Sequence, residues 1–160
     1  MADCCVVQPQ ASAAPGVMSC PRCGSRSKKV DALTVKSLVR RLPFDVEKTQ
    51  FYFCASHNCD VVYFGPSPAA PTFCRQDLLV RVGVKEQQDS IPVCYCFGIS
   101  RKDIRDEIEQ TGKSTVASRI GAEVRAGNCA CEVKNPSGKC CLGEVTRTVQ
   151  EALRVSQALP

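Results

Sequence analysis

The segment that decides the fold of this chain is residues 51–64, which read Phe51-Tyr52-Phe53-Cys54-Ala55-Ser56-His57-Asn58-Cys59-Asp60-Val61-Val62-Tyr63-Phe64. Two short runs of aromatic and β-branched residues, the types enriched in strands, flank a short polar turn. The segment is therefore predicted to form an antiparallel hairpin. Cys54 and Cys59 stand at the two ends of its loop, where both thiols are available to one metal ion.

A second pair of thiols lies upstream, in the stretch Cys20-Pro21-Arg22-Cys23-Gly24. Thiolates at C-x2-C spacing bind one metal, the proline presets the turn and the glycine lets backbone amides approach the sulfurs. Together with Cys54 and Cys59 they complete a tetrahedral site without an open position, which is typical of structural zinc. A single iron bound as in rubredoxin, or His57 in place of one cysteine, stays an alternative.

Thirteen cysteines in 160 residues, with one histidine, make thiolate sulfur the main supply of soft metal ligands. Disulfides would need an oxidising compartment, and the sequence begins without the basic and apolar stretches of a signal peptide. No segment approaches the roughly 18 apolar residues of a membrane span. We therefore expect a cytoplasmic protein whose reduced thiols bind metal.

The order of residue types predicts an α+β chain with two small domains, each stapled by metal because its core is small. Residues 1–18 are rich in Ala, Gln, Ser and Pro and are expected to form a flexible tail. A small β-rich zinc-ribbon domain is expected over residues 19–84, and the polar residues 85–92 are expected to be a linker. A small helical domain is predicted over residues 93–160.

Three helices are predicted in that second domain. The first starts after Ser100, with Asp103 in a capping box, and stops at Gly112. The second opens at Thr115 and the third near Gly143. Apolar residues recur at helical spacing in each of them.

A further set of cysteines surrounds these helices. Cys94 and Cys96 precede the first helix, and four more follow the second: Cys129, Cys131, Cys140 and Cys141. Paired thiolates at loop ends suit a [2Fe-2S] cluster, in which each iron takes two protein sulfurs. Spacing alone does not say which of the later cysteines bind, and a zinc site or a thiol redox pair would use the same atoms.

Several stretches resemble known metalloproteins. Val93-Cys94-Tyr95-Cys96 ahead of two short helices resembles the [2Fe-2S] domain of bacterioferritin-associated ferredoxin. The span from Cys20 to about Gly143 resembles the N-terminal half of the iron-sulfur and zinc type of CopZ copper chaperone. The stretches that carry this second resemblance, besides Val93 to Cys96, are Cys20-Pro21-Arg22-Cys23, Phe51-Tyr52-Phe53-Cys54, Cys59-Asp60-Val61-Val62-Tyr63-Phe64, Arg81-Val82-Gly83-Val84-Lys85 and Asn135-Pro136-Ser137-Gly138-Lys139-Cys140-Cys141.

The resemblance implies which cysteines bind which metal. The zinc ligands of the family fall on Cys20, Cys23, Cys54 and Cys59. Its cluster ligands fall on Cys94, Cys96, Cys131 and Cys141, which leaves Cys129 and Cys140 as neighbours. The usual bacterioferritin-associated ferredoxin closes its cluster with C-x2-C, which is absent here.

The resemblance also implies a function in soft-metal handling. Its [2Fe-2S] cluster would pass one electron and reduce Cu(II) to Cu(I), or support traffic of copper or mercury. The expected partners are copper or another soft metal ion, a copper chaperone or metal-transporting ATPase or transporter, and a redox partner. We expect an electron-transfer metallochaperone without catalytic residues, and not the separate copper-binding domain that follows in fused members of the family.

Two other classes of function stay open on the sequence. A zinc ribbon that binds nucleic acid or protein would fit the net charge of +5, but no basic run is interleaved with aromatic residues, which disfavours nucleic acid. A thiol enzyme would generally want a histidine partner, and His57 lies in the predicted zinc loop. The pair Cys4-Cys5 either captures a soft ion or is incidental.

Overall fold

The computed structural model describes residues 16–43 and 46–158 of the chain. Residues 1–15 of the predicted tail, with Cys4 and Cys5, lie outside the described residues. The first strand, β1 (Val17–Ser19), begins within the last residues of that predicted tail. The expected α+β class is confirmed, because a five-stranded antiparallel sheet comes first and most of the helices follow it.

The sheet pairs each strand with the next one along the chain. Its strands are β1, β2 (Arg26–Val30), β3 (Phe51–Phe53), β4 (Val61–Phe64) and β5 (Thr72–Cys74). β3 and β4 form the predicted hairpin, with Tyr52 opposite Phe64 and Phe53 opposite Tyr63. The ring centroids of these two pairs are 5.7 and 6.0 Å apart, so the aromatic residues that predict the hairpin also stabilise it.

A short helix, α1 (Ala32–Leu38), completes the core of the sheet half. Its Val35 packs in one buried cluster with Phe51, Val62 and Tyr63. The Asp31 carboxylate caps it by accepting the backbone N–H of Leu33. The sequence does not predict α1, because about two turns are too short for a periodic pattern. Three single turns of 3-10 helix complete this half: η1 (Val46–Lys48), η2 (Arg75–Asp77) and η3 (Gly83–Lys85).

The second half begins with a small hairpin, β6 (Pro92–Cys94) and β7 (Ile99–Ser100). The three predicted helices are present as α2 (Arg101–Thr111), α3 (Val116–Arg125) and α5 (Leu142–Ala158). Ser100 and Asp103 make the expected capping box, and Gly112 ends α2 in the left-handed region. α5 packs against both α2 and α3, around a core that includes the buried residues Ile104, Val116 and Val145.

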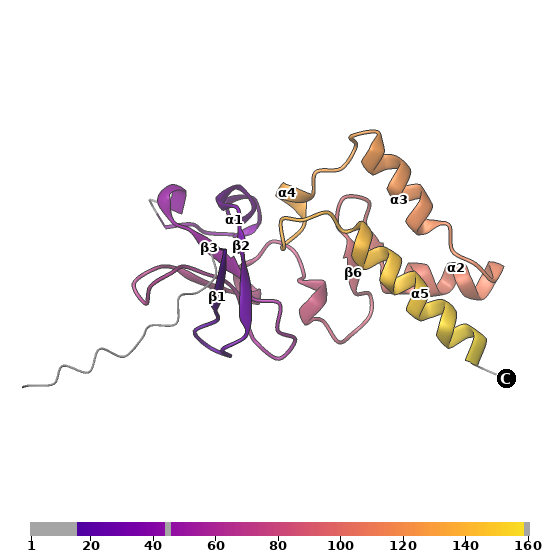
Figure 1. Cartoon of the computed structure of the whole chain (residues 1–160), viewed down its shortest axis with the longest axis horizontal. Helices are drawn as coiled ribbons and strands as arrows, with labels where there is room; N and C mark the ends of the chain where they lie inside the picture. Colours follow the sequence, from indigo (N-terminus) through magenta and orange to yellow (C-terminus); the bar gives the residue numbers. More distant parts are fainter. Residues whose placement is uncertain (1–15, 44–45, 159–160) are drawn as a thin grey trace, which may run out of the picture.

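The sheet half and the helical half are joined by more than the chain between them. The single-turn helix α4 (Cys131–Lys134) packs on α1 of the sheet half, and Figure 1 shows it between the sheet and the longer helices. The expected linker, residues 85–92, starts with a side chain that is not solvated, because Lys85 is only 2% exposed.

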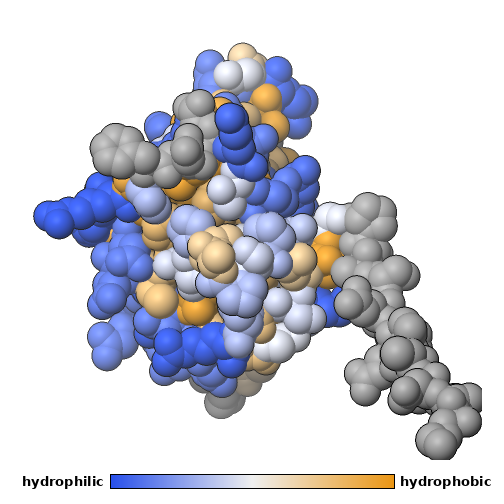
Figure 2. All heavy atoms as spheres, turned by 90° about the vertical axis from the view of Figure 1, so that its left-hand side faces the viewer, coloured by the Kyte–Doolittle hydropathy of each residue, from blue (hydrophilic) through white to orange (hydrophobic). Residues whose placement is uncertain are grey.

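Figure 2 looks onto the sheet half, where hydrophilic side chains gather along one side and apolar side chains appear in small patches. The patches are small because most aromatic side chains of the sheet are buried in the core. Within residues 16–43 and 46–158, no helix combines the length and the apolar content needed to cross a membrane.

Replacing Ser100 with Ala should lower the free energy of unfolding by about 1 kcal/mol, because the Ser100 side chain caps α2 by accepting the Asp103 backbone N–H. Urea unfolding followed by circular dichroism measures the change. Ser118→Ala, at an exposed position of α3, is the matched control and should change stability by less than about 0.5 kcal/mol. Equal losses in the two variants would contradict the capping role.

Candidate metal centres

Four cysteine sulfurs converge beside the β3–β4 hairpin. The Sγ atoms of Cys20, Cys23, Cys54 and Cys59 all lie within 4.8 Å of one another. The Cys20 and Cys59 sulfurs are 3.8 Å apart, and the Cys23 and Cys54 sulfurs 3.7 Å. Four thiolates held about 2.3 Å from a tetrahedral ion stand about 3.8 Å from each other. The donor set and its spacing therefore fit zinc.

The upstream pair is presented by the turn that follows β1. Gly24 N donates to Cys20 O and Cys20 N donates to Ser25 O, both at 2.9 Å, so the chain folds around the two sulfurs. Gly24 takes a φ of 71°, which a glycine adopts without the penalty that a Cβ atom would bring. Cys20 is buried and Cys23 is exposed at the rim of the site.

The downstream pair is fixed by the hairpin loop. Cys54 N donates to Val62 O at 2.9 Å, which continues the β3–β4 pairing up to the first thiol. Cys59 N donates to Ser56 O at 3.4 Å, and this hydrogen bond closes the loop at the second cysteine. Both cysteines are buried, whereas His57 between them is exposed and does not belong to the group of four sulfurs.

The protonation of these thiols depends on where each one lies. Burial raises the pKa of Cys54 to about 12, which disfavours a free thiolate there. Hydrogen bonds with Ser25 lower the pKa of the exposed Cys23 to about 6. A bound cation stabilises the thiolate form of all its ligands, so zinc binding would release the proton that Cys54 holds at neutral pH.

A buried ammonium lies against the downstream loop. Lys85 Nζ donates to Ser56 O and to Cys59 O, at 2.8 Å each. Its charge also favours the thiolate of Cys54. Burial of an uncompensated charge costs several kcal/mol, whereas zinc with four thiolates carries a net charge of −2. Lys85 is thus placed as a counter-charge for this centre, a role that the sequence resemblance did not reveal.

The later cysteines meet in two pairs in the helical half. The Cys94 and Cys141 sulfurs are 3.0 Å apart, and the Cys96 and Cys131 sulfurs 3.5 Å. Each pair joins a cysteine that precedes α2 in the sequence to a cysteine that follows α3. Cys94, Cys131 and Cys141 are at most 5% exposed.

These pairs are held at the ends of secondary-structure elements. Cys94 ends β6, Cys131 begins α4, and Cys141 directly precedes α5. Ala130 N donates to the Cys96 sulfur at 3.3 Å. The other two thiols of this region take no part in either pair: Cys129 is half-buried, and Cys140 is exposed.

The thiols of the two pairs differ in acidity. Cys141 donates to the Cys94 sulfur, which lowers the pKa of Cys94 to about 6 and raises that of Cys141. Burial raises the pKa of Cys131 to about 12. A bound metal centre would favour the thiolate form of all four, so its binding would release the protons held by Cys131 and Cys141.

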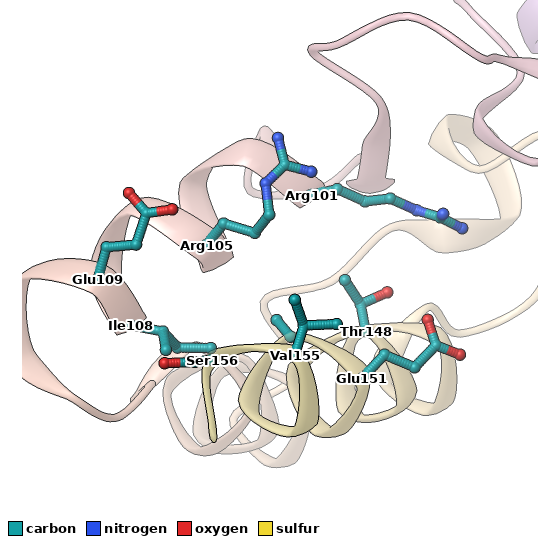
Figure 3. A pocket seen from close by; sticks show the side chains of 9 residues that line it. Arg101, Arg105, Ile108, Glu109, Thr148, Glu151, Val155 and Ser156 are labelled. Carbon is teal, nitrogen blue, oxygen red and sulfur yellow. The ribbon is translucent and has the colours of Figure 1, made fainter. Parts of the chain in front are cut away.

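A pocket of about 250 Å³ lies between α2 and α5, away from both sets of thiols. Figure 3 shows Ile108 and Val155 inside it, with Arg105 at its edge and its guanidinium directed away from α5. None of its lining residues is a cysteine or a histidine. It offers no soft metal ligand, so the candidate metal centres among residues 16–43 and 46–158 are the two thiol sets.

Comparison with known proteins places this geometry in a family. A family model described as a zinc-binding domain, of the CopZ type, matches residues 17–78, the segment that contains the four converging sulfurs. The crystal structure of the N-terminal domain of CopZ from Archaeoglobus fulgidus is 36% identical, with a TM-score of 0.67 over 81% of this chain and 96% of that domain. The chain belongs to the CopZ N-terminal domain family.

The full-length copper chaperone CopZ of A. fulgidus is 37% identical to this chain over 125 residues. The match covers 78% of this chain but only 58% of the chaperone. The resemblance to CopZ inferred from the sequence motifs is thereby confirmed for the zinc-binding domain.

Cys54→Ser should abolish zinc binding and remove the unfolding transition of the sheet half, because that half has a small core and no other closed four-thiol site among the described residues. Zinc analysis and thermal unfolding measure both effects. The control is Cys74→Ser, since Cys74 packs against the same cysteines without being one of the four. Retention of zinc and of a native transition by Cys54→Ser would refute the assignment.

Lys85→Met should weaken zinc binding by about tenfold or more while the fold is kept, because a buried counter-charge and two charge-assisted hydrogen bonds are lost. Competition with a chromophoric chelator gives the affinity. Lys29→Met, at an exposed position of β2, should bind zinc as the unmodified chain does. Equal affinities for all three proteins would contradict the counter-charge role.

Proposed function

We propose that this protein is an electron-transfer module of copper handling, with zinc on Cys20, Cys23, Cys54 and Cys59 and a [2Fe-2S] cluster on Cys94, Cys96, Cys131 and Cys141. The observation that carries the proposal is the arrangement of the second set of thiols as two close pairs. A bound cluster of this kind supplies one-electron exchange.

The pairing favours a two-iron centre over a single metal ion. Each iron of a [2Fe-2S] cluster takes two protein sulfurs, and two close pairs provide this directly. A mononuclear site needs at least three ligand atoms around one point. In the part of the chain that the structure describes, only the four sulfurs of the sheet half meet that condition within 4.8 Å. This difference supports zinc in one half and a cluster in the other.

Burial of the second set suits electron transfer more than substrate chemistry. Three of its thiols are nearly inaccessible and only Cys96 is half-buried. Four thiolate ligands complete the coordination of both irons, so no position stays open for an organic substrate. Cys140, the neighbour of Cys141 in the chain, is exposed, so the proposed cluster site lies near the protein surface. A docked partner or a copper ion can therefore approach from that side.

The cargo and partners follow from the family. The A. fulgidus relative is a copper chaperone by name, and Cu(I) is the oxidation state that soft thiolate carriers take. We assign to this protein the reduction of Cu(II) to Cu(I), for handover to a copper carrier or a metal-transporting ATPase or transporter. A redox partner must return one electron to the protein for each copper ion reduced. Mercury is a second soft-metal cargo that fits the same chemistry.

Cys131→Ser should abolish the visible chromophore of the reconstituted protein, whereas Cys129→Ser should retain it. The reason is that Cys131 forms a thiol pair with Cys96, and Cys129 lies in neither pair. Absorption spectra of the two variants, prepared side by side without oxygen, decide the assignment. Loss of the chromophore in Cys129→Ser with retention in Cys131→Ser would assign the ligand to Cys129 in place of Cys131.

Mixing the reduced protein with Cu(II) under anaerobic conditions should give about one Cu(I) per chain as the cluster is reoxidised, because the cluster exchanges one electron. Since free thiols also reduce Cu(II), the assay uses a Cys4→Ser, Cys5→Ser variant. A chromogenic Cu(I) chelator and the visible spectrum follow both changes. If that variant makes Cu(I) no faster with a reduced cluster than with an oxidised one, the copper-reductase function is wrong.

A further inference from the structure

The segment that carries the later cluster cysteines has little regular structure of its own. α4 is a single turn of four residues, Cys131–Lys134, and α5 starts only at Leu142. Within the connecting turn, Asn135 Nδ2 donates to Lys139 O at 2.8 Å. A single helical turn does not persist in water by itself. The positions of Cys131 and Cys141 therefore depend on what this segment packs against.

The surface against which it packs belongs to the sheet half. The Tyr63 hydroxyl, on β4, donates to the Pro136 carbonyl at 2.7 Å, and Tyr63 is completely buried. Thr34 on α1 donates its hydroxyl to Glu132 O, also at 2.7 Å. The backbone comes so close here that a Cβ atom on Gly138 would lie 2.8 Å from Thr34 Oγ1.

Tyr63 connects this contact to the zinc centre through one strand. β4 begins two residues after Cys59, and Val62 on the same strand accepts the backbone hydrogen bond of Cys54. Tyr63 thus follows Val62 directly on the strand that pairs with Cys54, while its ring packs in the core of the sheet half with Val35 and Phe51. Its hydroxyl reaches the turn that lies between Cys131 and Cys141 in the chain.

We infer that Tyr63 is a positioning residue for the iron-sulfur centre: its hydroxyl holds the Pro136 carbonyl and thereby sets where Cys131 and Cys141 present their sulfurs. The inference rests on the cluster assigned under the proposed function. It adds that the zinc-binding sheet forms one wall of the cluster site. Loss of zinc should therefore loosen β4 and, through Tyr63, destabilise the cluster.

The direct test is the lifetime of the cluster in the full chain after anaerobic reconstitution. Tyr63→Phe removes the hydroxyl and leaves a buried carbonyl without its donor, so the cluster should be lost to an iron chelator about tenfold faster. Zinc content and far-ultraviolet circular dichroism should stay unchanged. The matched control is Tyr52→Phe, on β3 of the same sheet, whose ring stacks on Phe64 and which should lose its cluster at the rate of the unmodified chain.

A second arm separates positioning from general stability. Removing zinc with a chelator that spares iron should accelerate cluster loss in the unmodified chain, and by a smaller factor in Tyr63→Phe, where the connection is already broken. The electron paramagnetic resonance spectrum of the reduced cluster should shift in Tyr63→Phe and not in Tyr52→Phe. Equal acceleration by zinc removal in the two proteins would overturn the inference.

The outcomes distinguish this inference from the function on which it rests. If the unmodified chain assembles no cluster, the proposed function fails and the inference with it. If it assembles one and Tyr63→Phe loses it at the same rate, only the inference fails. Should Tyr63→Phe disturb zinc binding as well, Thr34→Val provides the comparison, because it removes the contact to Glu132 O alone. An unchanged cluster lifetime in that variant overturns the part of the inference that makes the sheet half a wall of the cluster site.

Discussion

Four thiolates around one cation are the interaction on which the sheet half depends. Its hydrophobic core is small, and its strands are three to five residues long, which is marginal for a domain without a staple. A cation bound to the four sulfurs would tie the turn after β1 to the β3–β4 loop, two parts of the chain that are otherwise joined mainly through the pairing of β2. A zinc ion with four thiolates would carry a net negative charge, and the buried ammonium of Lys85, which already favours the thiolate of Cys54, would offset that charge.

The helical half depends on this arrangement at one place. α2, α3 and α5 share an apolar core of their own, and α2 is capped by Ser100 and Asp103, so the packing of these helices does not require the sheet. The segment from Cys131 to Cys141 differs, because two of its main-chain carbonyls, Glu132 O and Pro136 O, accept hydrogen bonds from Thr34 and Tyr63 of the sheet half. The sheet half therefore contacts the segment that carries two of the proposed cluster ligands, Cys131 and Cys141.

Local signals in the sequence predicted the parts of the fold that local chemistry determines. The β3–β4 hairpin follows from aromatic and β-branched runs around a polar turn, and α2 from the capping box at Ser100. α1 and α4 are too short for periodicity, and the polar strand β2 has little apolar pattern to reveal it. The nested pairing of Cys94 with Cys141 around Cys96 with Cys131, and the burial of Lys85, are tertiary facts that spacing along the chain does not encode.

The central claim is that one small chain holds two chemically different thiolate centres. The measurement that tests it most directly is the metal and acid-labile sulfide content of the anaerobically purified protein, together with its visible spectrum. The account predicts one zinc, two iron atoms and two sulfides per chain, with the spectrum of a [2Fe-2S] cluster. Zinc in both thiol sets, or iron without labile sulfide, would contradict it.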